Sequence, residues 1–214
     1  MISIKNLEGM LSREKLQAAC QSMAVLDAIL SQDWVYRYYS YNSEWSENEQ
    51  FFEMRNGQGS QLLFLFNPFG CVINGFCSES ENSDEQKVKA THGLPEIYHE
   101  FIYGEPVNSI GTTFCLWTNE DGIWVTGNNN STDDVSEELL SPFDGQPESY
   151  LNWATVYFAE GYNESGIPPK TVASIFNHEP LTKEMILSIT GTLEDWEQLE
   201  EDLEEISYPY HKTQ

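Results

Sequence analysis

The chain has few basic residues. Of its 214 residues, 10 are Lys or Arg and 35 are Asp or Glu, so the formal net charge at pH 7 is −25. Phosphate backbones and anionic lipid surfaces bind basic patches, and a chain of this charge repels them. The composition therefore argues against nucleic acid and membrane as direct ligands, and it favours a basic protein partner.

Long apolar runs are also absent. No stretch approaches the roughly 18 apolar residues that a membrane-spanning helix requires. The first residues, MISIKNLEGM, lack the basic start and apolar block of a secretory signal. Four cysteines lie scattered in apolar contexts, as buried free thiols do: Cys20, Cys71, Cys77 and Cys115. We therefore expect a cytoplasmic protein.

The sequence lacks the motifs of common catalytic and cofactor sites. It contains no Cys-x-x-Cys, His-Glu-x-x-His, Gly-x-Ser-x-Gly, Gly-x-Gly-x-x-Gly or Walker sequence. Cys71 and Cys77 are separated by six residues of expected strand, or about 20 Å, too far to share a metal ion. Cys115 lies in the apolar run TTFCLW, where burial makes a thiol inert. We predict no catalytic residue, no metal site and no cofactor.

Aromatic-rich segments dominate the part of the chain between Trp34 and Phe76. The runs WVYRYYSYN, EQFFEMRN, QLLFLFN and CVINGF alternate with turn-forming segments such as NGQGSQ and NPFG, a pattern that predicts adjacent antiparallel strands. A second hairpin, TTFCLWT and IWVT around the turn NEDG, extends the same sheet. In QLLFLF both alternating sets are apolar, which predicts a strand covered on both faces.

Apolar residues at helical spacing predict a helix over residues 12–31 and further helices over 95–103, 149–162, 167–180, 181–189 and 193–206. The polar, Ser-rich and acidic segment 77–93 is typical of an exposed loop. These elements predict a single α+β domain over residues 1–214. Its mostly antiparallel sheet has about six strands (residues 34–77 and 112–126), flanked by an N-terminal helix and several C-terminal helices.

Acidic clusters are the candidate functional feature. The last predicted helix carries eight carboxylates in twelve positions, with no base to pair with. Like charges at i,i+4, such as Glu197 with Glu201, destabilise a helix, and a partner rich in Lys and Arg relieves that repulsion. The alternatives are an ordinary solvated surface or a salt adaptation. The predicted partner-binding residues are Glu194, Asp195, Glu197, Glu200, Glu201, Asp202, Glu204 and Glu205, together with Asp133, Asp134, Glu137 and Glu138.

The segments NSEWSENEQFFEMRNGQGSQLLFLFNPFGCVINGF, LPEIYHEFIYGEP, TTFCLW and DGIWVTG resemble a family of small acidic bacterial cytosolic proteins, some of which are associated with toxin–immunity gene clusters. The resemblance covers roughly residues 30–127, with the helical tail as a plausible extension. It implies a binding protein and supplies no catalytic residues. From the net charge of −25, the missing catalytic motifs and the expected cytosolic location, we predict a non-catalytic, immunity-type inhibitor that binds a cognate basic toxin domain and blocks its active site.

Three other interpretations remain open at this stage. The protein could be a cytosolic enzyme whose carboxylates converge in a cleft with His92, His99 or His178. It could also be a general adaptor, distinguished from an inhibitor by whether its loss matters only when a toxin is present. An exposed aromatic patch could equally serve to form a homo-oligomer.

Overall fold

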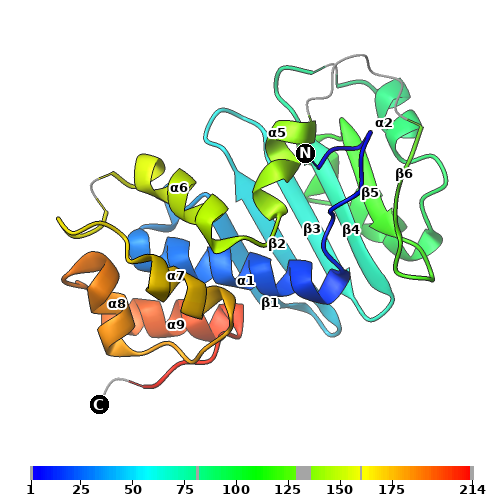
Figure 1. Ribbon diagram of the computed structural model, residues 1–214. Helices are drawn as coiled ribbons and strands as arrows, with labels where there is room; N and C mark the ends of the chain where they lie inside the picture. The colour runs from blue at the N-terminus through cyan, green and yellow to red at the C-terminus, as the bar shows by residue number, and fades with distance from the viewer. Residues whose placement is uncertain (1, 81, 129–135, 160, 213–214) are drawn as a thin grey trace.

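The computed structural model describes residues 2–80, 82–128, 136–159 and 161–212. Its centre is a six-stranded sheet whose strands are β1 (Tyr39–Ser46), β2 (Glu49–Arg55), β3 (Gln61–Asn67), β4 (Gly70–Phe76), β5 (Phe114–Thr118) and β6 (Trp124–Thr126). Each strand pairs antiparallel with the next one in the sequence, in the order β1-β2-β3-β4-β5-β6. The predicted α+β fold with an antiparallel sheet is therefore confirmed (Figure 1).

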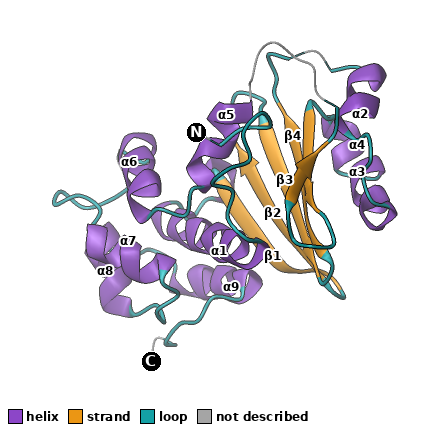
Figure 2. Cartoon of the chain, turned by 45° about the vertical axis from the view of Figure 1, so that its right-hand side comes forward, coloured by secondary structure: helices purple, strands orange, loops and turns teal. Residues whose placement is uncertain are grey.

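Helices cover both faces of this sheet (Figure 2). On one face lies α1 (Arg13–Leu30), joined by α5 (Ser136–Leu140), α6 (Pro147–Tyr157), α7 (Pro169–Phe176), α8 (Lys183–Thr190) and α9 (Trp196–Ile206). On the other face lie α2 (Asp84–Ala90), α3 (His99–Tyr103) and α4 (Val107–Ile110). The described residues also contain three short 3-10 turns: η1 (Trp34–Tyr36), η2 (Glu96–Tyr98) and η3 (Ser141–Phe143).

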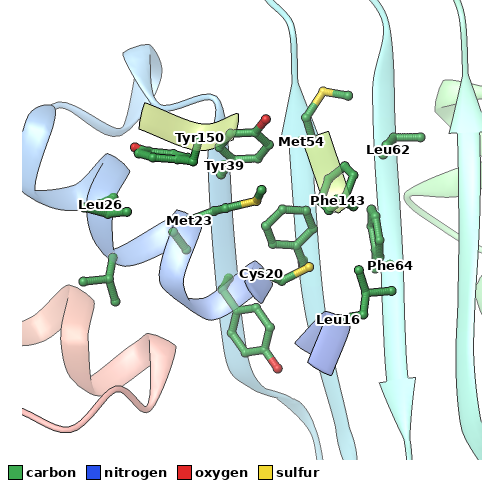
Figure 3. Close-up of a cluster of buried hydrophobic side chains, with 14 of the residues drawn as sticks. Leu16, Cys20, Met23, Leu26, Tyr39, Met54, Leu62, Phe64, Phe143 and Tyr150 are labelled. Carbon is green, nitrogen blue, oxygen red and sulfur yellow. The ribbon is translucent and has the colours of Figure 1, made fainter. Parts of the chain in front are cut away.

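Strand β3 separates two hydrophobic cores, as its doubly apolar pattern predicts. Leu62, Phe64 and Phe66 face the larger core beneath α1, while Leu63 and Leu65 face the smaller core beneath α3. Figure 3 shows the larger core, in which the α1 side chains meet the aromatic rings of the sheet. Because every side chain of the strand's centre is removed from water, β3 anchors both helical layers.

The prediction of a strand starting at Trp34 is wrong. Residues 34–36 form the turn η1 instead, because the Asp33 carboxylate accepts a hydrogen bond from the Val35 N–H (3.1 Å) and caps the turn. Strand β1 begins only at Tyr39. The hydrophobic side chains at the start of the predicted strand are consequently exposed: Trp34 is 51%, Val35 69% and Tyr36 65% accessible.

The predicted exposed loop over 77–93 is also wrong in part, because it contains helix α2. The Ser83 hydroxyl caps this helix by accepting a hydrogen bond from the Gln86 N–H (3.2 Å). Ala90 at its end is buried in the smaller core. The polar composition of this segment therefore did not reveal the helix, which is capped by Ser83, packs Ala90 against the smaller core and is tied to Thr113 by the Gln86 side chain (2.9 Å).

Edge strand β1 is protected by a buried carboxylate on α1. One oxygen of Asp27 accepts hydrogen bonds from the N–H groups of Tyr38 and Tyr39, each at 2.8 Å, and the other accepts one from the Tyr150 hydroxyl at 2.7 Å. Asp27 satisfies backbone donors that an edge strand would otherwise present to another chain. Burial raises the pKa of Asp27 to about 7.

Candidate protein-binding site

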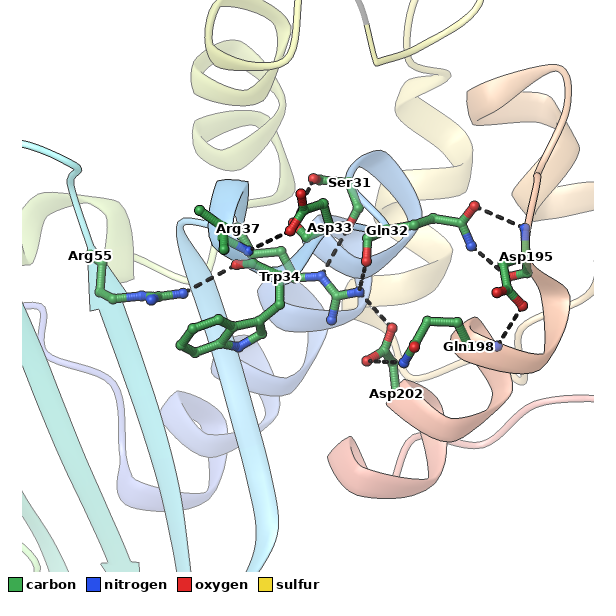
Figure 4. Close-up of polar contacts among 10 residues, drawn as sticks. Ser31, Gln32, Asp33, Trp34, Arg37, Arg55, Asp195, Gln198 and Asp202 are labelled. Carbon is green, nitrogen blue, oxygen red and sulfur yellow. Dashed lines mark hydrogen bonds and ion pairs between the residues drawn. The ribbon is translucent and has the colours of Figure 1, made fainter.

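Helix α9 lies beside edge strand β1, and its apolar residues place it there. Leu199, Leu203 and Ile206 recur at four- and three-residue steps and are buried in the larger core. Asp195 caps the helix through a hydrogen bond from the Gln198 N–H (3.0 Å). The Asp195 N–H in turn donates to the side-chain oxygen of Gln32 (3.0 Å), which ties the start of α9 to the end of α1 (Figure 4).

The inner side of α9 carries a buried ion pair. An oxygen of Asp202 lies 2.6 Å from Nη2 of Arg37, and both side chains are almost inaccessible to water. Arg37 also donates to the carbonyl oxygens of Ser31 (2.8 Å, from Nε) and Gln32 (3.1 Å, from Nη2). The expectation that this cluster has no base to pair with is therefore wrong. Asp195 and Asp202 hold the helix in place (Figure 4).

The outer side of α9 carries the acidic stripe, which we define as Glu197, Glu201 and Glu205. These residues are four positions apart, so they share one helical face, and all three are exposed. Glu194, just before the helix, is exposed as well, and Glu200 is half-buried. Glu204 accepts hydrogen bonds from Tyr210 (3.0 Å) and from Lys212 (3.4 Å).

Part of the second predicted cluster, Asp133 and Asp134, lies outside the described residues. Glu137 is half-buried and Glu138 exposed in the first turn of α5. Glu138 and Glu79 line one polar cleft of about 140 Å³, together with hydroxyl and amide side chains from the strand ends. The fold thus brings the acidic segments that contain Glu79 and Glu138 together at this polar cleft. No carboxylate of α9 lines it.

The aromatic cleft is a hollow of about 180 Å³ between η1, the β1–β2 hairpin and α9. Its lining includes five aromatic and four charged side chains: Trp34, Tyr39, Tyr41, Trp45, Phe51, Arg37, Glu53, Asp202 and Glu205. Trp45 stacks on Phe51 with the ring centres 4.4 Å apart. The guanidinium of Arg55 lies 3.7 Å from the centre of the Trp34 ring, a cation–π contact.

Two carboxylates of the aromatic cleft are partly removed from water, Glu53 more so than the surface residue Glu205. Burial raises the pKa of Glu53 and of Glu205, because removing a carboxylate from water disfavours its charged form. Arg55 opposes this effect at Glu53, with Nε of the arginine 3.7 Å from a Glu53 oxygen. Glu205 forms no ion pair with any residue in the described part of the chain.

Sequence reasoning did not predict the aromatic cleft. Of its lining, only Asp202 and Glu205 belong to the predicted partner-binding residues, and Asp202 is already paired. No histidine lines the cleft within the described ranges. His99 donates to the carbonyl oxygen of Leu94 (3.2 Å) and His178 to that of Ala18 (3.0 Å).

Neither a metal-binding cluster nor a membrane-spanning helix is present among the described residues. They contain no group of three or more His, Cys, Asp or Glu side chains arranged to hold a metal ion. None of their helices combines the length and the apolar character needed to cross a bilayer. Comparisons with protein-family models, with curated proteins and with solved structures found no match.

Proposed function

We propose that this protein is a non-catalytic, acidic binding protein that acts by occupying the basic surface of another protein. In its most specific form, the proposal is an immunity-type inhibitor that blocks the active site of a cognate basic toxin domain. The observation that carries it is the exposed acidic stripe of α9, which lies next to a cleft with aromatic walls.

The charge balance supports a basic partner. Even if each of the 10 Lys and Arg side chains paired with a different carboxylate, 25 of the 35 carboxylates would have no cation. Several of the cations are already used within the chain: Arg13, Arg37, Arg55, Lys89 and Lys212 form ion pairs. A basic surface would gain from this uncompensated charge, chiefly through faster association and selection against other partners.

The exposed aromatic side chains support a protein rather than a small polycation as the partner. Trp34, Val35 and Tyr36 lie beside α6, where the Tyr157 hydroxyl donates to the carbonyl oxygen of Tyr36 (3.3 Å). Large exposed aromatic and apolar groups next to charge are typical of the buried centre of protein interfaces. The acidic stripe would then form the polar rim.

The test is to identify the partner and to measure what binding does to it. The purified chain is used as bait in lysate of cells that carry its gene, at about 0.01 M and about 1 M salt, where the Debye length falls from about 30 Å to about 3 Å. The proposal predicts a basic protein that is lost at high salt and whose toxicity to a host is suppressed by co-expression of this chain. A partner without net positive charge, or one whose toxicity is unchanged, contradicts it.

A further inference from the structure

The aromatic cleft can be assigned a specific occupant. We propose that it binds the guanidinium group of an arginine side chain of the partner, against the rings of Trp34 and Trp45 and opposite the carboxylate of Glu205. This assignment rests on the proposed function, since it names the group through which a basic partner is anchored.

The walls of the cleft suit a planar cation. Trp34, at 51% exposure, and Trp45, at 42%, both offer ring surface to the solvent of the cleft. The chain itself already places one guanidinium, that of Arg55, over the Trp34 ring at 3.7 Å. Trp34 lines the cleft but Arg55 does not. The part of the Trp34 side chain that faces the cleft is therefore open to a second cation. Guanidinium groups stack on indole rings more readily than ammonium groups do.

The charges of the cleft favour a cation as well. Its lining holds three carboxylates and one arginine, a formal charge of −3 + 1 = −2. Arg37 is neutralised by Asp202 at 2.6 Å, and Glu53 lies 3.7 Å from Arg55, so Glu205 is the carboxylate without a cation. One Glu205 oxygen accepts a hydrogen bond from the Asn42 amide (2.9 Å). The other accepts none among the described residues, and a guanidinium would supply the missing donors.

The position of the cleft connects it to the acidic stripe. Glu205 is the last residue of the stripe on α9 and also part of the cleft lining. A basic partner steered onto Glu197 and Glu201 would therefore reach the cleft without leaving the acidic surface. A buried arginine at the centre and exposed ion pairs around it is the usual arrangement of an interface hot spot.

The probe is a short glycine- and serine-based peptide with one arginine, compared with the same peptide carrying citrulline, its neutral isostere. Binding to the full chain is followed by the NMR shifts of the Trp34 and Trp45 indole N–H signals. We expect the arginine peptide to shift both signals and the citrulline peptide to bind at least about tenfold more weakly. Equal binding by the two peptides overturns the assignment.

Variants locate the peptide in the cleft. Trp45→Leu is expected to weaken arginine-peptide binding about 2- to 30-fold and Glu205→Gln about 2- to 5-fold. Glu120→Gln removes the same charge from an exposed position in the β5–β6 turn, at the opposite edge of the sheet from β1, and should leave affinity unchanged at about 0.15 M salt. Trp45 and Glu205 are both exposed, so these variants retain the core.

The same variants separate the two proposals. If a basic partner binds the chain in a salt-sensitive way and the cleft variants bind it as tightly as the parent, the cleft assignment is wrong and the proposed function stands. If the arginine peptide binds in the cleft and no basic protein partner is found, the proposed function is wrong and the cleft assignment stands.

Discussion

The two sides of helix α9 use acidic residues in opposite ways. On the inner side, Asp195 caps the helix and Asp202 forms a buried ion pair with Arg37. On the outer side, Glu197, Glu201 and Glu205 are exposed and pair with no cation in the described ranges. One acidic run in the sequence therefore contains carboxylates that build the fold and carboxylates that remain available to a partner.

The two groups of carboxylates also differ in side-chain length. The inner carboxylates are the shorter aspartates, held close to the backbone by one or two fixed contacts, while the outer ones are glutamates whose charge reaches into the solvent. Asp27 extends the inner class, since it is buried by the helical layer and receives three hydrogen bonds but no ion pair.

The largest effect is expected at Asp202. In Asp202→Ala, Arg37 stays buried with its ion-pair partner removed, and such an uncompensated charge costs about 3–5 kcal/mol of unfolding free energy. Urea unfolding measures the loss. The double variant Arg37→Leu, Asp202→Ala should recover part of it, because the buried charge is gone. A loss of unfolding free energy below about 1 kcal/mol would mean that the ion pair is solvent-exposed and contributes little.

Asp27 should make stability depend on pH. Its pKa is about 7 in the fold against 3.8 in the unfolded chain, so between these values the native carboxyl keeps a proton that the unfolded one releases. Stability therefore falls as pH rises through this window, by about 4 kcal/mol in total, and is level above it.

Asp27→Asn tests this dependence, because the amide copies the protonated carboxyl. Its oxygen can accept from Tyr38 and Tyr39 while its NH₂ group donates to Tyr150. The difference in unfolding free energy between parent and variant should change by about 4 kcal/mol between about pH 4 and about pH 8, to the disadvantage of the parent. Parallel pH profiles would contradict the burial argument.

The cap at Asp195 is expected to contribute less. Asp195→Ala removes the acceptor of the Gln198 N–H and should cost about 1 kcal/mol of unfolding free energy. Glu194→Ala, one position earlier and exposed, is the matched control and should stay within about 0.5 kcal/mol of the parent. Equal losses at the two positions would show that Asp195 acts only through its charge.

The smallest effect is expected on the outer side, with the opposite sign. Glu201→Gln removes like-charge contacts with Glu197 and Glu205, each worth about 0.2–0.5 kcal/mol, so the variant should be slightly more stable than the parent. The gain should disappear at about 1 M salt. A loss of stability would mean that Glu201 has a structural contact.

The sheet could be predicted from the sequence because its turn residues and strand patterns each lie within a short segment. The turns between Arg55 and Gln61 and between Asn67 and Gly70 fall where Gly, Asn and Pro predict them, and QLLFLF is the central strand its pattern indicates. The first residue of β1 could not be predicted from the sequence. The run beginning at Trp34 has strand propensity, but the Asp33 cap and the hydrogen bonds from Arg37 to two carbonyl groups favour a turn.

The candidate site was only half predictable. The acidic stripe follows from helical spacing in one segment. The aromatic cleft does not, because it joins Trp34, Trp45 and Glu205, which only the fold brings together. Nor could the sequence show which acids are used internally, since the partner of Asp202 is 165 residues away at Arg37. The one local signal was Asp195, placed before the apolar run of α9 where a cap belongs.

The most direct test of the central claim is the rate at which the captured basic partner associates with a triple variant, Glu197→Gln, Glu201→Gln and Glu205→Gln. A matched control removes three exposed charges elsewhere, at Glu96, Glu100 and Glu120. The account predicts an association rate at least about tenfold below the parent at low salt for the stripe variant, with an unfolding free energy no lower than the parent's, and a near-parental rate for the control. Equal rates for the stripe variant and the control would contradict it.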